Sequence, residues 1–293
     1  MKKIFKPFSI LLVLTTLSFL FFGCQHPTDN TTDDTNKSVT ITIGELTITT
    51  RKVYENTVTK DEAAKTITFE PTKEEVEYTL SGSFEGQIIN KTKGTVFFLN
   101  GVSLSNTEGI PAVYGELKTE IKAAENTVNT ITVSGEAIDS KSGALQCEKT
   151  LEIGGSGTLT VTCENAHGVK ASKVELKGSG TFTFDGGSDS SAVNCNEFVV
   201  DEDKTFTANF KDSKNGIKAD ETITIASGTF NFENITKAAL NTDTSKDDAT
   251  KEHFIKLDGG TFTFTNCTEK KFKKQSTEDG KFTKAESVVG DFE

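Results

Sequence analysis

The sequence predicts an all-β protein, a right-handed parallel β-helix with an N-terminal β cap, on three observations. An apolar residue recurs every 24 positions, at Leu145, Val169, Val193 and Ile217. A second marker, in which threonine alternates with an apolar residue, begins at Thr158, Thr181, Thr205, Thr229 and Thr261. Alternation of this kind has the period of a β-strand. A fixed repeat in the twenties is typical of stacked solenoids, and a sandwich of antiparallel hairpins does not explain it.

Each repeat is long enough for three short strands and their turns, at about 3.3 Å per residue. Copies of one strand then stack parallel and in register. The expected inner columns are Leu159, Phe182, Phe206, Phe230 and Phe262, and beside them Val161, Phe184, Phe232 and Phe264. The expected outer rows are Thr158, Thr181, Thr205, Thr229 and Thr261, and beside them Thr160, Thr183, Thr207, Asn231 and Thr263.

Residues 1–23 have the features of a lipoprotein signal peptide. Three lysines precede an apolar run, residues 8–22, that is short for a membrane span. The following Gly23-Cys24-Gln25 resembles a lipobox, although Phe21 stands where leucine is usual. We therefore expect Cys24 to be lipidated and the protein to be anchored in a bacterial cell envelope, outside the cytoplasm. The alternative is an ordinary secretory signal in which Cys24 has no role.

Residues 24–38 are expected to be a flexible tether. The segment is rich in Thr, Asp and Asn and has no large apolar residue between Gln25 and Lys37, so it cannot bury enough surface to fold. Without residues 1–23 the chain has 29 basic and 43 acidic residues, a net charge of −14. That acidity argues against nucleic acid as a partner and against docking on anionic lipid, so the lipid anchor is the expected membrane attachment.

Residues 39–293 are expected to form one domain with three parts. Residues 39–77 form the cap and entry strands, residues 78–267 the rungs, and residues 268–293 a charged C-terminal tail. The step from Val113 to Leu145 is 32 rather than 24, which implies a loop of about eight residues. A second insertion falls around residues 241–253. Turns of a solenoid tolerate insertions, and inserted loops are frequent binding sites.

Five motifs between Glu75 and Phe264 stand out. They are Leu80-Ser81-Gly82-Ser83-Phe84-Glu85-Gly86-Gln87-Ile88, Leu99-Asn100-Gly101-Val102, Pro111-Ala112-Val113, Ile153-Gly154-Gly155-Ser156-Gly157-Thr158-Leu159-Thr160-Val161 and Asn215-Gly216-Ile217. Over this span the chain resembles a bacterial family of secreted or lipid-anchored β-helix proteins described as carbohydrate-binding and related in shape to polysaccharide lyases. The resemblance implies attachment to a cellulose- or pectin-like polysaccharide, with bound calcium.

One departure from the family bears on calcium. Family members carry Asp-Gly-Ile before each rung, whereas this chain has His167-Gly168-Val169, Ala192-Val193 and Asn215-Gly216-Ile217 there. Calcium takes six to eight oxygen ligands, usually including carboxylates. The remaining candidates lie in neighbouring turns: Asp185, Asp189 and Asp212. The alternative is that aspartate is a common turn residue.

Two kinds of residue are candidates for contact with sugar. Tyr114, beside the Pro111 motif, is the best stacking candidate in a chain without tryptophan. The outward threonines, Thr158, Thr181, Thr205 and Thr229, present hydroxyls at strand spacing to a flat polymer. Against these stand two structural interpretations: Tyr114 packs at a strand end, and threonine simply favours β-strands and pairs with itself.

The sequence offers little for catalysis. Arg51 is the only arginine, although lyase chemistry on uronates uses a basic residue, and no pair of carboxylates is marked out for a glycosidase. We expect a monomeric, non-catalytic polysaccharide-binding protein. The alternatives are an adhesin or structural solenoid that binds a protein, and a weak polysaccharide lyase. The cysteines after Cys24 are expected to stay unpaired, because Cys147 and Cys195 lie two rungs apart, about 9.6 Å.

Overall fold

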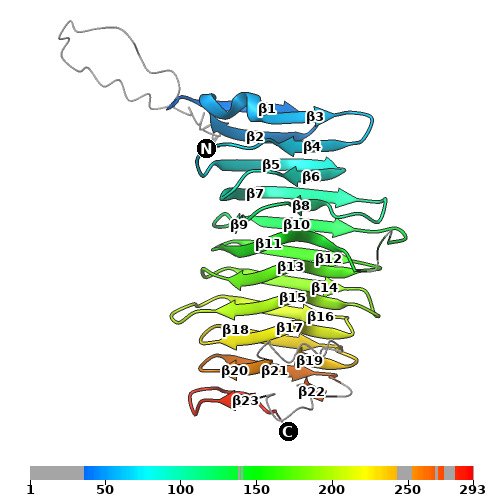
Figure 1. Cartoon of the computed structure of the whole chain (residues 1–293), viewed down its shortest axis with the longest axis vertical. Helices are drawn as coiled ribbons and strands as arrows, with labels where there is room; N and C mark the ends of the chain where they lie inside the picture. Colours follow the sequence, from blue (N-terminus) through cyan, green and yellow to red (C-terminus); the bar gives the residue numbers. More distant parts are fainter. Residues whose placement is uncertain are drawn as a thin grey trace, which may run out of the picture. The chain divides into compact units, whose positions relative to one another are not determined.

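The computed structural model describes residues 36–137, 139, 141–242, 253–267, 270–273 and 281–292. All of them belong to one compact unit, Asp34–Glu293. They form a parallel β-solenoid of about eight turns, which confirms the predicted fold class, and the strands stack from β1 at one end to β23 at the other (Figure 1). The signal peptide, Cys24 and most of the tether lie outside the described residues. Within the described part of the chain, no helix has the length and apolar character needed to cross a membrane.

Three parallel sheets, here named A, B and C, make up the sides of the solenoid. Sheet A contains the end of β5 (Glu77–Glu85), the end of β7 (Thr95–Asn106), β10 (Val128–Val133), β12 (Thr158–Cys163), β14 (Thr181–Gly186), β16 (Thr207–Lys211), β18 (Thr229–Glu233) and β21 (Thr261–Thr265). Each strand pairs parallel with the copy one turn away, as the repeat requires.

Sheets B and C share four long strands that bend at the corner between the sheets. Sheet B contains β4 (Thr66–Phe69), β6 (Gln87–Asn90), β8 (Val113–Gly115), the first parts of β11 (Gly143–Gly155), β13 (His167–Leu176), β15 (Ser191–Val200) and β17 (Asn215–Ile225), then β19 (Ala238–Asn241) and β22 (Lys270–Lys273). Sheet C contains the first parts of β5 and β7, then β9 (Thr119–Ala123), the second parts of β11, β13, β15 and β17, β20 (Phe254–Leu257) and β23 (Lys281–Lys284).

The predicted N-terminal cap is made of two antiparallel hairpins. The first joins β1 (Ser38–Ile43) to β2 (Leu46–Arg51), and β2 pairs with β5 on top of sheet C. A 3-10 helix, η2 (Lys52–Thr57), leads to the second hairpin, in which β3 (Val58–Asp61) pairs with β4 on top of sheet B. The two hairpins therefore cover the first rungs of two sheets.

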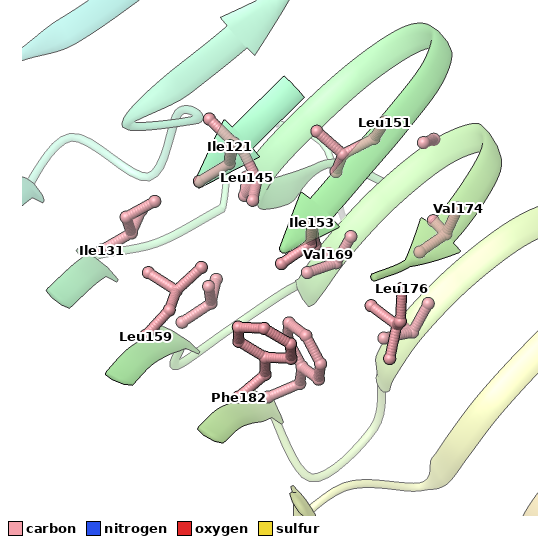
Figure 2. Packing of buried hydrophobic residues seen from close by; sticks show 14 of the residues in the cluster. Ile121, Ile131, Leu145, Leu151, Ile153, Leu159, Val169, Val174, Leu176 and Phe182 are labelled. Carbon is pink, nitrogen blue, oxygen red and sulfur yellow. The ribbon is translucent and has the colours of Figure 1, made fainter. Parts of the chain in front are cut away.

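Columns of apolar side chains fill the interior. Figure 2 shows three pairs of register partners on successive turns: Leu145 with Val169, Leu151 with Val174, and Ile153 with Leu176. All six side chains are at most 1% exposed. Because each side chain packs chiefly on the equivalent residues above and below, the turns stabilise one another.

The predicted phenylalanine column is wrong at one position. Phe182 pairs with Ala208, not with Phe206, and Ala208 pairs with Phe230. Six residues separate β15 from β16, whereas four separate β13 from β14, so the later strand starts two residues further along the chain. A shift of two keeps the inward and outward alternation. Phe206 is therefore still fully buried, with its ring 5.8 Å from that of Phe182 and 5.6 Å from that of Phe230.

The same shift changes the neighbouring column and both outer rows. Phe210 stands between Phe184 and Phe232, at a position of the second column for which the repeat predicted no aromatic residue. On the outside, Thr207 takes the place expected for Thr205, and Asn209 takes the place expected for Thr207. Thr205 lies in the turn before β16 and is not part of the row.

The first predicted insertion is confirmed. From Ile131 to Leu145 the chain takes 14 residues, whereas the equivalent step from Val161 to Val169 takes 8. Six of the extra residues thus lie in the turn 134–142, between sheets A and B, and the other two lie between β9 and β10. The second insertion falls mostly in residues 243–252, outside the described residues.

Cys147, Cys163 and Cys195 are buried free thiols, as expected. Cys147 and Cys195 are both register partners of Ala171, one on each side, so they lie two rungs apart on the inside of sheet B. Burial raises the pKa of the Cys147 thiol. These thiols therefore act as small core side chains.

Candidate functional site

An open groove lies on the outer face of sheet B, next to the turn 134–142. Its volume is about 360 Å³. It is lined by Gln87, Ile89, Gly109, Ile110, Pro111, Tyr114, Asp139, Ser142 and Gln146. The insertion inferred from the 32-residue step thus supplies one wall, through Asp139 and Ser142.

The groove combines an apolar surface with amide and carboxylate groups. Ile89, Ile110, Pro111 and the Tyr114 ring are all partly exposed. Gln87 is oriented by a hydrogen bond from its Nε2 to the carbonyl oxygen of Pro111, at 3.0 Å. A partly exposed ring beside fixed polar groups suits a ligand that has both apolar faces and hydroxyl edges, as a sugar has.

Glu148 accepts hydrogen bonds from two polar side chains of the groove. Tyr114 Oη donates to Glu148 Oε1 at 3.1 Å, and Gln146 Nε2 donates to the same oxygen at 3.2 Å. Partial burial and the negative charge of Glu148 raise the pKa of the Tyr114 hydroxyl. The phenol therefore stays neutral and remains a hydrogen-bond donor at ordinary pH.

A row of polar side chains continues from Tyr114 along the same sheet. Register places Ile89, Tyr114, Gln146, Lys170, Asn194, Lys218 and Asn241 in line on successive turns. Burial lowers the pKa of the Lys170 ammonium, and Asp220 opposes that effect. Lys218 Nζ lies 3.5 Å from Asp220 Oδ1. Gln146, Lys170 and Lys218 are partly exposed, whereas Asn194 and Asn241 are buried. The row therefore offers a ligand that runs along the solenoid the amide of Gln146 and, one and three turns further on, the ammonium groups of Lys170 and Lys218.

The threonine candidates lie on a different sheet from Tyr114. Thr158, Thr181 and Thr229 are on the outside of sheet A, in one row with Thr207 and Thr261. In the adjacent row, Asn209 Nδ2 donates to Thr183 Oγ1 at 3.3 Å and Asn231 Nδ2 donates to Asn209 Oδ1 at 3.0 Å. Part of the hydrogen-bonding capacity of sheet A is thus used between neighbouring turns. One ligand strand cannot contact both groups of candidates side by side.

The structure brings two of the three aspartate candidates together. Asp185 ends a strand of sheet A, and Asp212 lies in the turn that follows the neighbouring strand β16, where it accepts a hydrogen bond from Asn234 Nδ2 at 2.7 Å. Burial, and then the charge of Asp212, raises the pKa of Asp185 to about 6. Asp189 is exposed in a separate turn. Across the described residues no three side chains of His, Cys, Asp or Glu are grouped so as to hold a metal ion. The expected trio therefore does not form a ready carboxylate site, and calcium stays a prediction.

Sequence reasoning found Tyr114 but missed the groove around it. Gln87, Ile89 and Ile110 belong to earlier turns that show no clear 24-residue period. The position of Gln146 could have been predicted from the repeat, because the alignment of Val113 with Leu145 also places Tyr114 beside Gln146. The position of Asp139 and Ser142 depends on the path of an inserted loop, which the repeat does not specify.

Three comparisons with known proteins bear on this site. Residues 61–174, which include every residue that lines the groove, match a family model described as "Carbohydrate-binding domain-containing protein". No curated protein matches the chain. Among solved structures, a polysaccharide lyase-like protein from C. thermocellum, determined as a gadolinium derivative, superposes with a TM-score of 0.55. That match has 20% sequence identity and covers 80% of this chain and 92% of the other.

The identity to the C. thermocellum protein is low, so that likeness shows the shared fold alone. The family match confirms, over residues 61–174, the resemblance to carbohydrate-binding proteins that was inferred from the motifs. The chain is thus a β-solenoid that is similar, across its Tyr114 groove, to a family of carbohydrate-binding domains.

Proposed function

We propose that this protein binds a cellulose- or pectin-like polysaccharide through the Tyr114 groove, without cleaving it. The observation that carries the proposal is that the groove, with its ring, amides and carboxylate, is built from residues 61–174, the part that matches carbohydrate-binding domains. The Tyr114 ring packs against one face of a sugar unit. Gln87, Gln146 and Asp139 exchange hydrogen bonds with its hydroxyls.

The row below the groove extends the contact along the polymer. Lys170 and Lys218 follow Gln146 in register, one and three turns further on, and both are partly exposed. An extended sugar chain that runs along the solenoid therefore meets these two ammonium groups beyond the groove. The acidic chain binds a polyanionic glycan only where such lysines, or a bound cation, offset its charge.

The contacts of the basic side chains support the proposal that no cleavage occurs, because lyase chemistry needs a basic residue at the sugar. Arg51 donates from Nη2 to Tyr54 Oη at 3.0 Å and lies 3.9 Å from Glu74 Oε2, in the N-terminal cap. It is thereby committed to cap contacts and lies in a part of the chain outside the groove. Lys170 and Lys218 are the basic residues that follow the groove in register, and Lys218 is paired with Asp220.

We further propose that the protein acts as a monomer held by lipid at Cys24 on the outer surface or periplasmic side of a bacterial envelope. The signal-like residues 1–23 and the polar tether support this arrangement. A lipid at Cys24 is tested by the mass of the purified native protein and by its loss in Cys24→Ala. A mass equal to that of the unmodified mature chain contradicts it.

Binding is tested by sedimentation of the mature protein with insoluble cellulose and by affinity electrophoresis in gels that contain soluble pectate, each with and without EGTA. We expect retention on at least one polymer. Retention that survives EGTA shows that binding does not need calcium, and retention that is lost in EGTA shows that it does. Failure on both polymers and on other plant glycans contradicts the proposal. The appearance of the ultraviolet absorbance of unsaturated uronate products in the pectate sample contradicts the absence of catalysis.

A further inference from the structure

The first strand of sheet A has an open edge. Sheet C is covered at this end by β2, and sheet B by β4 and β3. The segment Gly82–Glu85 of β5 pairs with β7 on one side, and no other strand among the described residues pairs with it. The cap thus completes two sides of the solenoid and leaves the third without its top rung.

Two turns of the cap stand at the ends of this segment. A Cβ on Gly82 would lie 2.1 Å from the carbonyl oxygen of Glu45, and a Cβ on Gly86 would lie 2.1 Å from that of Lys65. Both glycines have positive φ, 89° and 150°. Close backbone approach at these two glycines fixes the β1–β2 turn on one side of Ser83–Glu85 and the β3–β4 turn on the other.

The space between the two turns is a slot of about 640 Å³. It is lined by Ile43, Gly44, Glu45, Lys60, Glu62, Lys65, Ser83, Phe84, Glu85, Ser103 and Ser105. Phe84 is the register partner of Leu104, which is 1% exposed, and so it belongs to an inner column. Its ring is nevertheless partly exposed because nothing of the described chain stacks above it.

The main chain of the open edge is ready to pair. Gly86 N donates to Ser105 O at 2.8 Å, so the peptide groups at Phe84 and Gly86 face β7. By alternation, the N–H and C=O groups of Ser83 and Glu85 face the slot. An extended peptide satisfies such groups, and this mode of recognition is known as β-augmentation. A sugar does not present alternating main-chain donors and acceptors.

Charge specifies the side chains of the occupant. Lys60 Nζ is bound to Glu62, and Lys65 Nζ lies 3.0 Å from Glu85 Oε1. Glu45 accepts a hydrogen bond from Ser83 Oγ, and no Lys, Arg or His of the described residues forms an ion pair with it. Among the described residues, Glu45 is therefore a carboxylate of the slot without a cationic partner, and it lies beside Ser83. A basic side chain opposite Ser83 complements it.

We propose that this slot binds an extended peptide from a protein partner, which supplies the missing first rung of sheet A. The bound segment spans the three to five residues between the two cap turns and runs parallel to β5. It places a β-branched apolar side chain over Phe84 and a lysine or arginine opposite Ser83. This protein-binding activity is separate from the polysaccharide-binding groove on sheet B.

The test uses a fluorescently labelled peptide, acetyl-Thr-Lys-Val-Thr-Thr-amide, in which Lys is placed opposite Ser83 and Val opposite Phe84. Its binding to the mature chain is followed by fluorescence polarisation. A second peptide carries N-methyl groups on Val and on the last Thr, the residues whose N–H groups face the Ser83 and Glu85 carbonyls. We expect binding of the first peptide and a loss of about tenfold or more for the second, since two main-chain hydrogen bonds are removed.

A matched pair of variants tests the protein side. Glu85→Pro removes a main-chain donor that faces the slot, at an edge position that tolerates proline, and Glu85→Gln removes only the charge. We expect about a tenfold loss of affinity in E85P and no more than about a threefold change in E85Q. The N-methylated peptide decides the question even if E85P does not fold.

Three results overturn the proposal. They are no binding of the first peptide, equal binding of the two peptides, and displacement of the peptide by a soluble cello-oligosaccharide, which would make the slot a sugar site. Tyr114→Ala should leave peptide binding unchanged. Failure of the peptide experiment therefore says nothing against polysaccharide binding at Tyr114, and the reverse also holds.

Discussion

Tyr114 and Gln146 lie in direct register on neighbouring strands of sheet B, and both donate to the same oxygen of Glu148, at 3.1 and 3.2 Å. A shared acceptor holds the ring and the amide in fixed positions before any ligand arrives. Preorganisation of this kind reduces the entropy lost on binding. Glu148 is thus a positioning residue for the groove.

Replacement of the Tyr114 ring tests whether it contacts the glycan. Tyr114→Ala should weaken retention on the polysaccharide about tenfold, because an aromatic face and its buried area are lost. Tyr114→Phe keeps the ring and loses only the bond to Glu148, so it should bind within about threefold of the wild type. Affinity electrophoresis in gels that contain the soluble polymer measures both. Equal mobility shifts for Ala and Phe would show that the ring makes no contact.

The repeat in the sequence was sufficient to predict the fold, because each strand pairs mostly with the equivalent strands of the turns above and below it. Leu145, Val169, Val193 and Ile217 form an inner column as expected from their constant spacing. The repeat does not reveal the two-residue shift before β16, because Phe206 and Phe210 are an even number of residues apart and either alignment buries a phenylalanine. Periodicity fixes which face is inside more firmly than it fixes register.

The site was less accessible to sequence reasoning than the core. Tyr114 could be singled out as a rare aromatic residue, but its neighbours come from a turn without a period and from strands that precede the clear repeats. The open edge at Ser83–Glu85 depends on which strands the cap fails to cover. That absence is a property of tertiary arrangement, and no local pattern in residues 39–77 encodes it.

The register shift itself has a stability consequence. Phe206 fills the space beside the small Ala208, which stands between Phe182 and Phe230. Phe206→Ala should reduce the free energy of unfolding by roughly 3–5 kcal/mol, through lost burial and a cavity. In that background Ala208→Phe should recover at least about 1 kcal/mol, because the new ring enters the vacated space. Urea denaturation of the single and double variants measures the coupling, and additive effects would contradict the shifted register.

His167 should make the protein less stable in acid. Its Nδ1 accepts a hydrogen bond from Ser191 N at 3.0 Å, and burial, then Lys170 and Lys218, lowers its pKa to about 4. Between about pH 6.5 and 4 the unfolded chain binds a proton that the folded chain does not, so stability falls as the pH falls through that window. The loss is on the order of 2 kcal/mol once partial solvent exposure is allowed for. In His167→Asn, which keeps an acceptor for Ser191, thermal melts should show a smaller fall over this range.

Asp185 should act in the opposite direction over nearly the same range. Its pKa is raised to about 6 by burial and by Asp212, so the folded chain binds a proton more tightly than the unfolded chain between about pH 4 and 6. Stability contributed by this group is therefore lost as the pH rises through that window. Asp185→Asn should remove this loss. The change in melting temperature from pH 4 to pH 7 should therefore be more positive in the variant than in the wild type. Asp212→Asn should reduce the effect without abolishing it, since burial of Asp185 remains.

The same variants decide whether Asp185 and Asp212 hold calcium. A bound cation favours the ionised carboxylates, so millimolar calcium chloride should raise the melting temperature of the wild type at pH 7 and flatten its pH dependence around pH 6. Magnesium chloride at the same ionic strength controls for screening of charge. Asp185→Asn should lose the calcium response, but without calcium its melting temperature at pH 7 should still be higher than that of the wild type. An identical response to the two salts, or a full calcium response in that variant, would place any calcium elsewhere on the chain.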